Sequence, residues 1–140
     1  MTNAALQQLA QRRCEPCRGG IPPMHPATVV DWLLYLPGWD QSDDYTKIRK
    51  TFRFRDFATA LAFVNRLGEA AEEQDHHPDL FLAWGMVEVI LWTHKIKGLS
   101  ESDFIMAAKT EVLAADAPGH KVVDAGLTRG YANSDLPSKV

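Results

Sequence analysis

Three histidines and their acidic neighbours are the residues of this 140-residue sequence best suited to chemistry. His76 and His77 are adjacent in a loop that ends at a proline, and His94 follows them by less than twenty residues. Imidazole has an unperturbed pKa near 6.5 and exchanges protons at neutral pH. Two imidazoles facing each other across an apolar pocket would act as acid and base without a cofactor. A neighbouring carboxylate, Glu72 or Asp75, would fix their tautomers.

Two other interpretations of these histidines remain open. Adjacent histidines in a loop are commonly solvated surface residues. A metal site built from His76, His77 and His94 with Glu72 would also use suitable ligands. However, adjacent histidines rarely bind one ion together, and the sequence has no H-E-x-x-H, nucleophile elbow, P-loop or dinucleotide fingerprint. The residues alone indicate a cofactor-free proton-transfer site and go no further.

Cys14 and Cys17 form a single C-x-x-C motif. A structural zinc site needs four ligands, and His25 lies at a spacing that matches no zinc pattern. A thioredoxin-like motif should follow a strand and open a helix, whereas CEPCRGGIPP is typical of a loop. We interpret both thiols as reduced and non-catalytic, with a metal or a redox role as the alternatives.

Alternation of apolar and polar residues predicts two strands. The first covers about 45–54, with Ile48, Phe52 and Phe54 on its apolar face. The second is expected to run as one long strand from Phe81 to His94, before Gly98 breaks it. On that strand one face carries Val87, Val89 and Leu91, and the other carries Met86, Ile90 and Trp92.

Apolar spacings of three and four predict helices. The clearest follows Asp56 as N-cap and ends near residue 73, with an apolar stripe of Phe57, Ala60, Leu61, Val64, Leu67, Gly68 and Ala71. Ser100 and Asp103 resemble a capping box that opens another helix. Shorter or weaker helices are expected within 1–13 and 26–36.

Strands and helices do not alternate as in a parallel sheet, so the sequence predicts an α+β fold. An antiparallel sheet would be covered on one face by two or three helices. The broad apolar stripes suggest an oligomer that buries the remainder. We expect an N-terminal segment over 1–25, the folded domain over 26–114 and a flexible C-terminal tail over 115–140.

Composition and charge are those of an ordinary globular domain. Lys and Arg number 15 against 18 Asp and Glu, the net charge is −3 and 46% of residues are apolar. Five basic residues between 47 and 55 would suit a nucleic-acid surface, but the acidic balance favours a solvated sheet face. Because no long apolar run or signal-like segment is present, a cytoplasmic protein without membrane contact is expected.

The histidine region resembles the pterin-4a-carbinolamine dehydratase family. The family pattern has an acidic residue, three intervening residues, His-His-Pro, then an aromatic residue, a third His and a further Asp. This sequence matches it with Glu72, His76-His77-Pro78, Trp84, His94 and Asp103. The segments PGW at 37–39, FRFRDFATALAFVNRLGEAAEEQDHHPD and WTHKIKGLSESDFIMAAKTEVL are also similar, so the resemblance covers about 14–113.

The resemblance implies both a fold and a reaction. The fold is an antiparallel four-stranded sheet with about three helices on one face, assembled as a homodimer or homotetramer. The reaction removes water from 4a-hydroxytetrahydropterin to give quinonoid dihydropterin, which recycles the pterin used by an aromatic amino acid hydroxylase. No redox change occurs, so no metal, flavin or nicotinamide cofactor is implied; the pterin is the substrate.

Position by position, the resemblance implies three catalytic histidines. His76 and His94 would move the two protons, and His77 would orient the substrate. The residues expected to contact the pterin are Glu72, Asp75, Pro78, Trp92, Thr93, Lys95, Trp39 and Asp103. For Trp39 a core-filling role is the open alternative. Trp92 departs from the small polar residue that often precedes the Thr-His pair in the family.

A second function from a different class is a regulatory binding module. Some animal members of the family act as a dimerisation cofactor for a transcription factor through a helical face. The intact histidines favour catalysis here, and the lack of basic excess gives no reason to expect nucleic-acid contact. A histidine-ligated metal protein is the third possibility.

Overall fold

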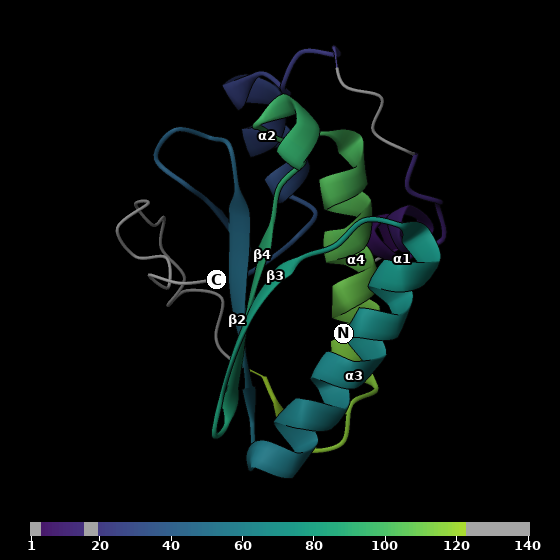
Figure 1. Ribbon diagram of the computed structural model, residues 1–140, viewed down its shortest axis with the longest axis vertical. Helices are drawn as coiled ribbons and strands as arrows, with labels where there is room; N and C mark the ends of the chain where they lie inside the picture. Colours follow the sequence, from purple (N-terminus) through teal and green to yellow (C-terminus); the bar gives the residue numbers. More distant parts are fainter. Residues whose placement is uncertain (1–3, 16–19, 123–140) are drawn as a thin grey trace.

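An antiparallel sheet backed by helices on one face makes up the part of the chain that is described, residues 4–15 and 20–122, in this computed structural model (Figure 1). The strand order is β1-β2-β4-β3, and the short β5 pairs with β2. This confirms the predicted α+β class. The elements are α1 (Ala4–Ala10), α2 (Pro26–Leu33), β1 (Asp40–Gln41), β2 (Ile48–Phe54), α3 (Phe57–Gln74), β3 (Asp79–Ala83), β4 (Met86–Leu91), the 3-10 turn η1 (His94–Ile96), α4 (Glu101–Ala115) and β5 (His120–Lys121).

The expected single strand from Phe81 to His94 is wrong, because the segment forms a hairpin. Ala83 pairs with Met86, so Trp84 and Gly85 form a two-residue turn between β3 and β4. Both arms are largely apolar, and the turn contains only one glycine, so the sequence pattern runs through the turn. The hairpin brings the start of β3 beside the end of β4, where Asp79 pairs with Ile90.

Helix α3 begins and ends close to its predicted limits. The Asp56 side chain accepts a hydrogen bond from the Thr59 amide at 2.9 Å, as an N-cap should. Its buried stripe is Ala60, Phe63, Leu67 and Ala71. Phe57 and Leu61, which the spacing placed on the core face, are instead 44% and 39% exposed.

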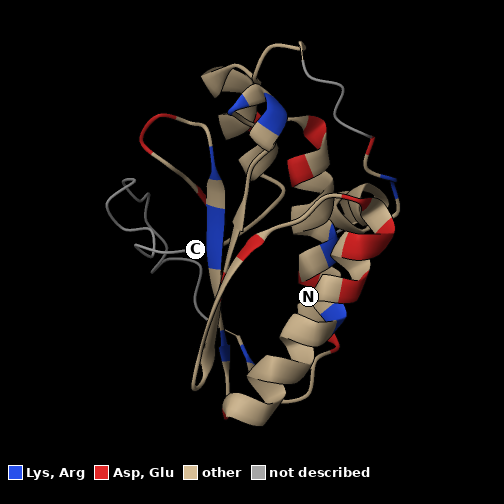
Figure 2. Cartoon of the chain, viewed as in Figure 1, with Lys and Arg blue, Asp and Glu red and all other residues tan. Residues whose placement is uncertain are grey.

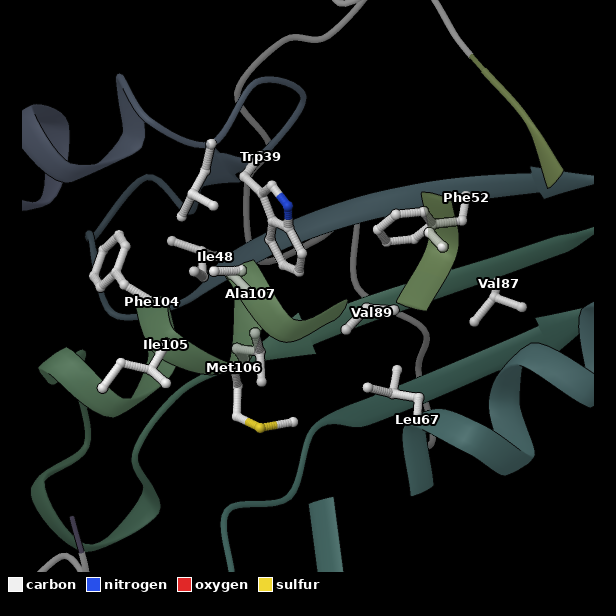
Figure 3. Close-up of a cluster of buried hydrophobic side chains, with 14 of the residues drawn as sticks. Trp39, Ile48, Phe52, Leu67, Val87, Val89, Phe104, Ile105, Met106 and Ala107 are labelled. Carbon is white, nitrogen blue, oxygen red and sulfur yellow. The ribbon is translucent and has the colours of Figure 1, made fainter. Parts of the chain in front are cut away.

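The core fills the space between the sheet and helices α3 and α4 (Figure 3). From β2 come Ile48, Phe52 and Phe54, and from β4 come Val87, Val89 and Leu91, so both apolar faces are as predicted. Helix α4 is buried nearly all round from Ser102 to Ala108, because α1, α3 and the sheet pack against it. Phe104 also meets Trp32 of α2, with ring centroids 5.3 Å apart.

Basic residues of β2 pair with carboxylates of neighbouring elements. Figure 2 shows the run of Lys and Arg along this strand. Arg49 lies 2.9 Å from Glu88 of β4, and Lys50 lies 2.6 Å from Glu111 of α4. Lys50 shares the helix-facing side of β2 with Ile48 and Phe52, and the Arg49–Glu88 pair on the other side is largely buried, so neither pair lies on a freely solvated face.

The segment after α4 remains packed for several residues beyond the predicted start of the tail at 115. Ala117 is 9% exposed, and β5 pairs with the end of β2 through His120 opposite Phe54. Residues 123–140 lie outside the described ranges, as do Cys17 and the rest of 16–19. Within the described ranges, no helix is long and apolar enough to cross a membrane.

The hairpin turn yields a stability prediction. A Cβ added at Gly85 would lie 2.8 Å from the backbone oxygen of Phe54, and the Phe54 amide donates to the Gly85 carbonyl at 2.8 Å. Gly85→Ala should therefore lower the free energy of unfolding by about 1–3 kcal/mol, because backbone must move. Urea denaturation measures the change.

Gly68→Ala is the matched control. No atom lies within 4 Å of a Cβ added at Gly68 in α3, so alanine should stabilise the helix by about 0.5–1 kcal/mol. Equal changes in the free energy of unfolding for Gly68→Ala and Gly85→Ala would contradict the close backbone contact at the hairpin turn.

Candidate active site

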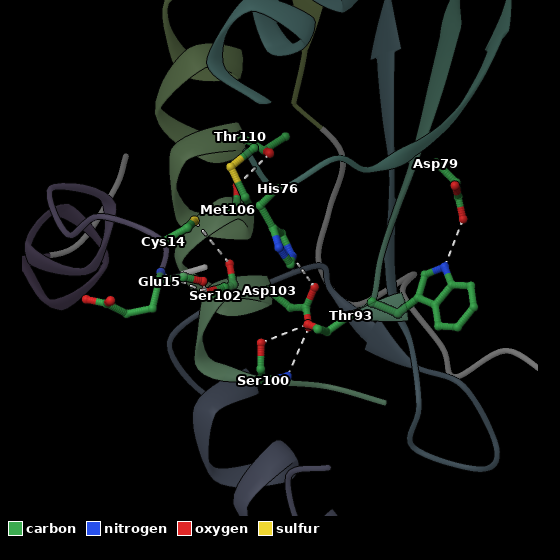
Figure 4. A network of polar contacts seen from close by, with 11 residues as sticks. Cys14, Glu15, His76, Asp79, Thr93, Ser100, Ser102, Asp103, Met106 and Thr110 are labelled. Atoms are coloured by element: carbon green, nitrogen blue, oxygen red, sulfur yellow. Dashed lines mark hydrogen bonds and ion pairs between the residues drawn. The ribbon is translucent and has the colours of Figure 1, made fainter. Parts of the chain in front are cut away.

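The end of α3 determines where the histidine pair leaves the helix. Asp75 adopts the left-handed conformation with φ of 51°, and the His76 amide donates to the Ala71 carbonyl at 3.2 Å. This turn stops the helix and satisfies its last carbonyls. The His76 side chain therefore points towards α4 (Figure 4), while the His77 side chain is exposed.

A single buried carboxylate then joins three segments of the chain (Figure 4). Asp103 of α4 is fully buried, and its Oδ1 lies 2.6 Å from Nε2 of His76. Its Oδ2 accepts from the Thr93 hydroxyl at 2.7 Å and from the Ser100 amide at 3.0 Å. The last contact confirms the predicted capping box.

These donors explain how a carboxylate remains buried at this position. Burying a charge is costly unless hydrogen bonds replace its water. Asp103 receives three such bonds and lies in the first turn of α4, where the helix dipole favours negative charge. As a carboxylate, Asp103 can only accept, so the proton of neutral His76 is on Nε2 and its Nδ1 carries a lone pair. His76 is therefore held in one tautomer.

His77 has a different environment from His76. Its Nε2 lies 2.5 Å from Oε2 of Glu72, and the two side chains are 53% and 79% exposed. An ion pair this exposed contributes little to stability because water screens it. The contact orients the His77 ring relative to the last turn of α3.

His94 lies just past the end of β4, at the first residue of η1. Its ring stacks on Trp92, with centroids 4.0 Å apart and 27° between the planes. Thr93 between them points the other way, to Asp103. The His94 segment and the His76 loop therefore meet at one carboxylate, although each imidazole has its own partner.

The remaining predicted contact residues divide between this region and the core. Pro78 and Asp75 flank the histidine pair, and Lys95 lies in η1 beside His94. Trp39 is 4% exposed, and its Nε1 donates to Glu111 at 2.9 Å. Glu111 is two turns beyond Asp103 on α4, about 12 Å along the axis. These contacts fit the core-filling alternative for Trp39.

Two residues near the histidines were not among those predicted. Asp79 accepts a hydrogen bond from Nε1 of Trp92 at 2.9 Å, and the Lys47 ammonium lies 4.7 Å from the centroid of the same indole. Both lie across the sheet from Trp92. Asp79 is brought there by the register of the β3–β4 hairpin and Lys47 by the register of β2 with β4, and the sequence pattern indicates neither.

Cys14 is buried away from solvent and close to the N-terminus of α4. Its Sγ lies 3.6 Å from the Ser102 carbonyl oxygen, and its amide donates to Gln74. Burial raises the pKa of the Cys14 thiol to about 11, so it remains protonated at neutral pH. Among residues 4–15 and 20–122, no three His, Cys, Asp or Glu side chains are grouped to hold a metal ion.

Replacing Asp103 tests the carboxylate that joins the segments. Asp103→Asn retains the volume but substitutes an NH2 group for one accepting oxygen, so at least one donor loses its partner. The free energy of unfolding should fall by about 1–3 kcal/mol in chemical denaturation. An unchanged stability would contradict the network, and Asp116→Asn, at the exposed end of α4, is the control.

Cys14→Ser tests the interpretation of the C-x-x-C motif. Because the Cys14 thiol is buried and protonated, its loss should leave the dehydration activity expected from the sequence nearly unchanged. Steady-state rates of the two proteins provide the measurement. A loss of turnover in a variant that retains its folded circular dichroism spectrum would contradict the non-catalytic assignment.

Comparisons with known proteins agree on one family. The model of the pterin 4 alpha carbinolamine dehydratase family matches residues 22–113. A protein of Rubrobacter xylanophilus, provisionally named a pterin-4-alpha-carbinolamine dehydratase, is 49% identical over 77% of this chain and all of its own length. A protein of Methylococcus capsulatus with the same provisional name is 47% identical over 78% of this chain and 96% of its own.

Solved structures share the fold. A transcriptional coactivator/pterin dehydratase of Brucella melitensis is 35% identical with a TM-score of 0.62, over 65% of this chain and 97% of that chain. A pterin dehydratase-like RuBisCO assembly factor of the alpha-carboxysome is 23% identical with a TM-score of 0.50, over 57% and 93%. By its family match and its relatives, this chain belongs to the pterin 4 alpha carbinolamine dehydratase family.

Proposed function

We propose that this protein catalyses the dehydration of 4a-hydroxytetrahydropterin to quinonoid dihydropterin by histidine acid-base catalysis. The supporting observation is that His76 is held by Asp103, the same carboxylate that binds Thr93 beside His94. The two histidines therefore flank one polar junction at the end of the sheet. Family membership supports the substrate class.

The reaction needs what two imidazoles supply. The hydroxyl at C4a leaves as water only when a proton reaches its oxygen as the C4a–O bond breaks. A pterin nitrogen gives up a proton to complete the new double bond. Atoms and charge then balance with the loss of one water and no redox change, so the proposal requires no metal, flavin or nicotinamide. General acid and base catalysis contributes about 10²–10⁴-fold for each proton transfer.

In this proposal His76 and His94 handle the two protons. The paired Asp103 favours the tautomer of His76 in which Nδ1 is free to exchange a proton. His77, oriented by Glu72, aligns the substrate. The pterin would be held by the segments around these histidines, including Asp75, Pro78, Thr93 and Lys95.

The physiological setting belongs to the same proposal. The enzyme would act in the cytoplasm as a homodimer or homotetramer. Its product would return to an aromatic amino acid hydroxylase by way of a reductase. The exposed apolar residues Val30 of α2, at 45%, and Leu34, the residue that caps the end of α2, at 76%, favour self-association.

A second candidate function is protein binding. The related Brucella melitensis structure, at 35% identity, is titled both a transcriptional coactivator and a pterin dehydratase. A chain of this family could therefore bind a partner protein through a helical face in addition to acting on a pterin. Variants of the histidines would abolish turnover and leave such binding unchanged.

Stopped-flow dehydration of synthetic 4a-hydroxytetrahydropterin tests the proposed reaction. His76→Ala and His94→Ala should each lower kcat by about 10²–10⁴-fold, because each removes one proton carrier. His25→Asn is the matched control, because His25 lies at α2 and asparagine preserves its N-cap to the Ala27 amide.

Chelator treatment of the wild type should leave its rate unchanged. Loss of activity after chelation would instead support the histidine-ligated metal protein. A folded wild type that does not accelerate the reaction would overturn the proposed enzyme and favour the binding module.

A further inference from the structure

Trp92 lies in a stack of three side chains at the end of β4. The His94 ring stacks on the indole at a centroid distance of 4.0 Å. The ammonium group of Lys47 lies over the same indole, 4.7 Å from its centroid. The indole of Trp92 is therefore in contact with two other side chains.

The indole is fixed at its edge as well as by these two contacts. Its Nε1 donates to Oδ2 of Asp79 at 2.9 Å (Figure 4). Asp79 is the first residue of β3, which pairs with β4, so this anchor belongs to the sheet. A half-buried indole with a satisfied N–H and a stacked neighbour has little freedom to move.

Lys47 reaches the indole from the next strand. Ile48 pairs with Leu91, so continuing the antiparallel register places Lys47 opposite Trp92. The Lys47 carbonyl accepts from the Ser42 amide at 2.9 Å, which fixes the backbone just before β2. A cation over an indole face is attracted by the π-electrons. Two neighbouring strands thus hold Trp92 in place.

We propose that Trp92 is a positioning residue that holds the His94 ring for proton transfer, with Asp79 and Lys47 fixing the indole. The inference rests on the proposed function and deepens it. His94 itself is exposed and lies in a short 3-10 turn, so the rest of its surroundings restrain the ring little. Trp92 acts through His94, because the His94 ring stacks directly on the indole.

The physical effect is pre-organisation of one proton carrier. A ring that samples several rotamers is in the productive orientation for only part of the time, which lowers kcat. Uniform substrate binding is unaffected by that loss, so KM should change little. A direct contact between Trp92 and substrate would instead show itself mainly in KM.

The test combines NMR with steady-state kinetics on Trp92→Leu, Trp92→Phe and Asp79→Ala. The His94 carbon-bound ring protons, assigned with His94→Gln, should show a ring-current shift in the wild type. Trp92→Leu should abolish this shift and lower kcat about 10–100-fold with KM within about twofold. Trp92→Phe, which keeps an aromatic face, should retain part of the ring-current shift and part of the wild-type kcat. Asp79→Ala should give a His94 ring-current shift and a kcat that lie between those of the wild type and of Trp92→Leu.

Phe57→Leu is the control, because Phe57 is a 44% exposed aromatic residue at the first position of α3, at the opposite end of that helix from His76. It should leave the His94 shift and kcat unchanged. An unshifted His94 in the wild type, or a raised KM with unchanged kcat in Trp92→Leu, would overturn the positioning role. If the wild type has no turnover, the proposed function fails by itself, and the His94 shift still decides whether the stack exists.

Discussion

A fully buried carboxylate at the start of α4 is the constraint on which the site depends. Because no water reaches the Asp103 carboxylate, its hydrogen-bond donors must come from the protein. They are provided by His76, Thr93 and Ser100. These donors come from the loop after α3, the end of β4 and the residue that caps α4. The hydrogen bonds that this one buried carboxylate requires therefore fix three segments relative to one another.

The fold supplies this junction through two local features. The left-handed Asp75 stops α3 and releases the histidine pair at the sheet edge. The tight turn at Gly85 folds β3 back on β4, so the residues before β3 and after β4 lie at the same end. One face of β4 packs on the helices, and the other presents Trp92 to its neighbours on adjacent strands. Helix burial and site geometry thus follow from the same alternation of side chains.

Much of this arrangement could be predicted from local patterns. The cap at Asp56, the capping box at Ser100 and the buried faces of β2 and β4 each depend on residues close in sequence. The hairpin could not be predicted in this way, because its turn lies inside a segment whose apolar pattern is continuous. The contacts of Trp92 depend on cross-strand register, which is set by tertiary structure. The role of each histidine stays a prediction, since geometry locates a proton carrier without showing its reaction.

The tautomer of His76 tests the account most directly. Nitrogen-15 NMR of the wild type, assigned with His76→Gln, distinguishes a protonated Nε2 from a protonated Nδ1. The buried carboxylate of Asp103 predicts a protonated Nε2 with a slowly exchanging proton and an unprotonated Nδ1 when the ring is neutral. A neutral ring protonated on Nδ1, or a mixture of tautomers with rapid exchange, would contradict the junction described here.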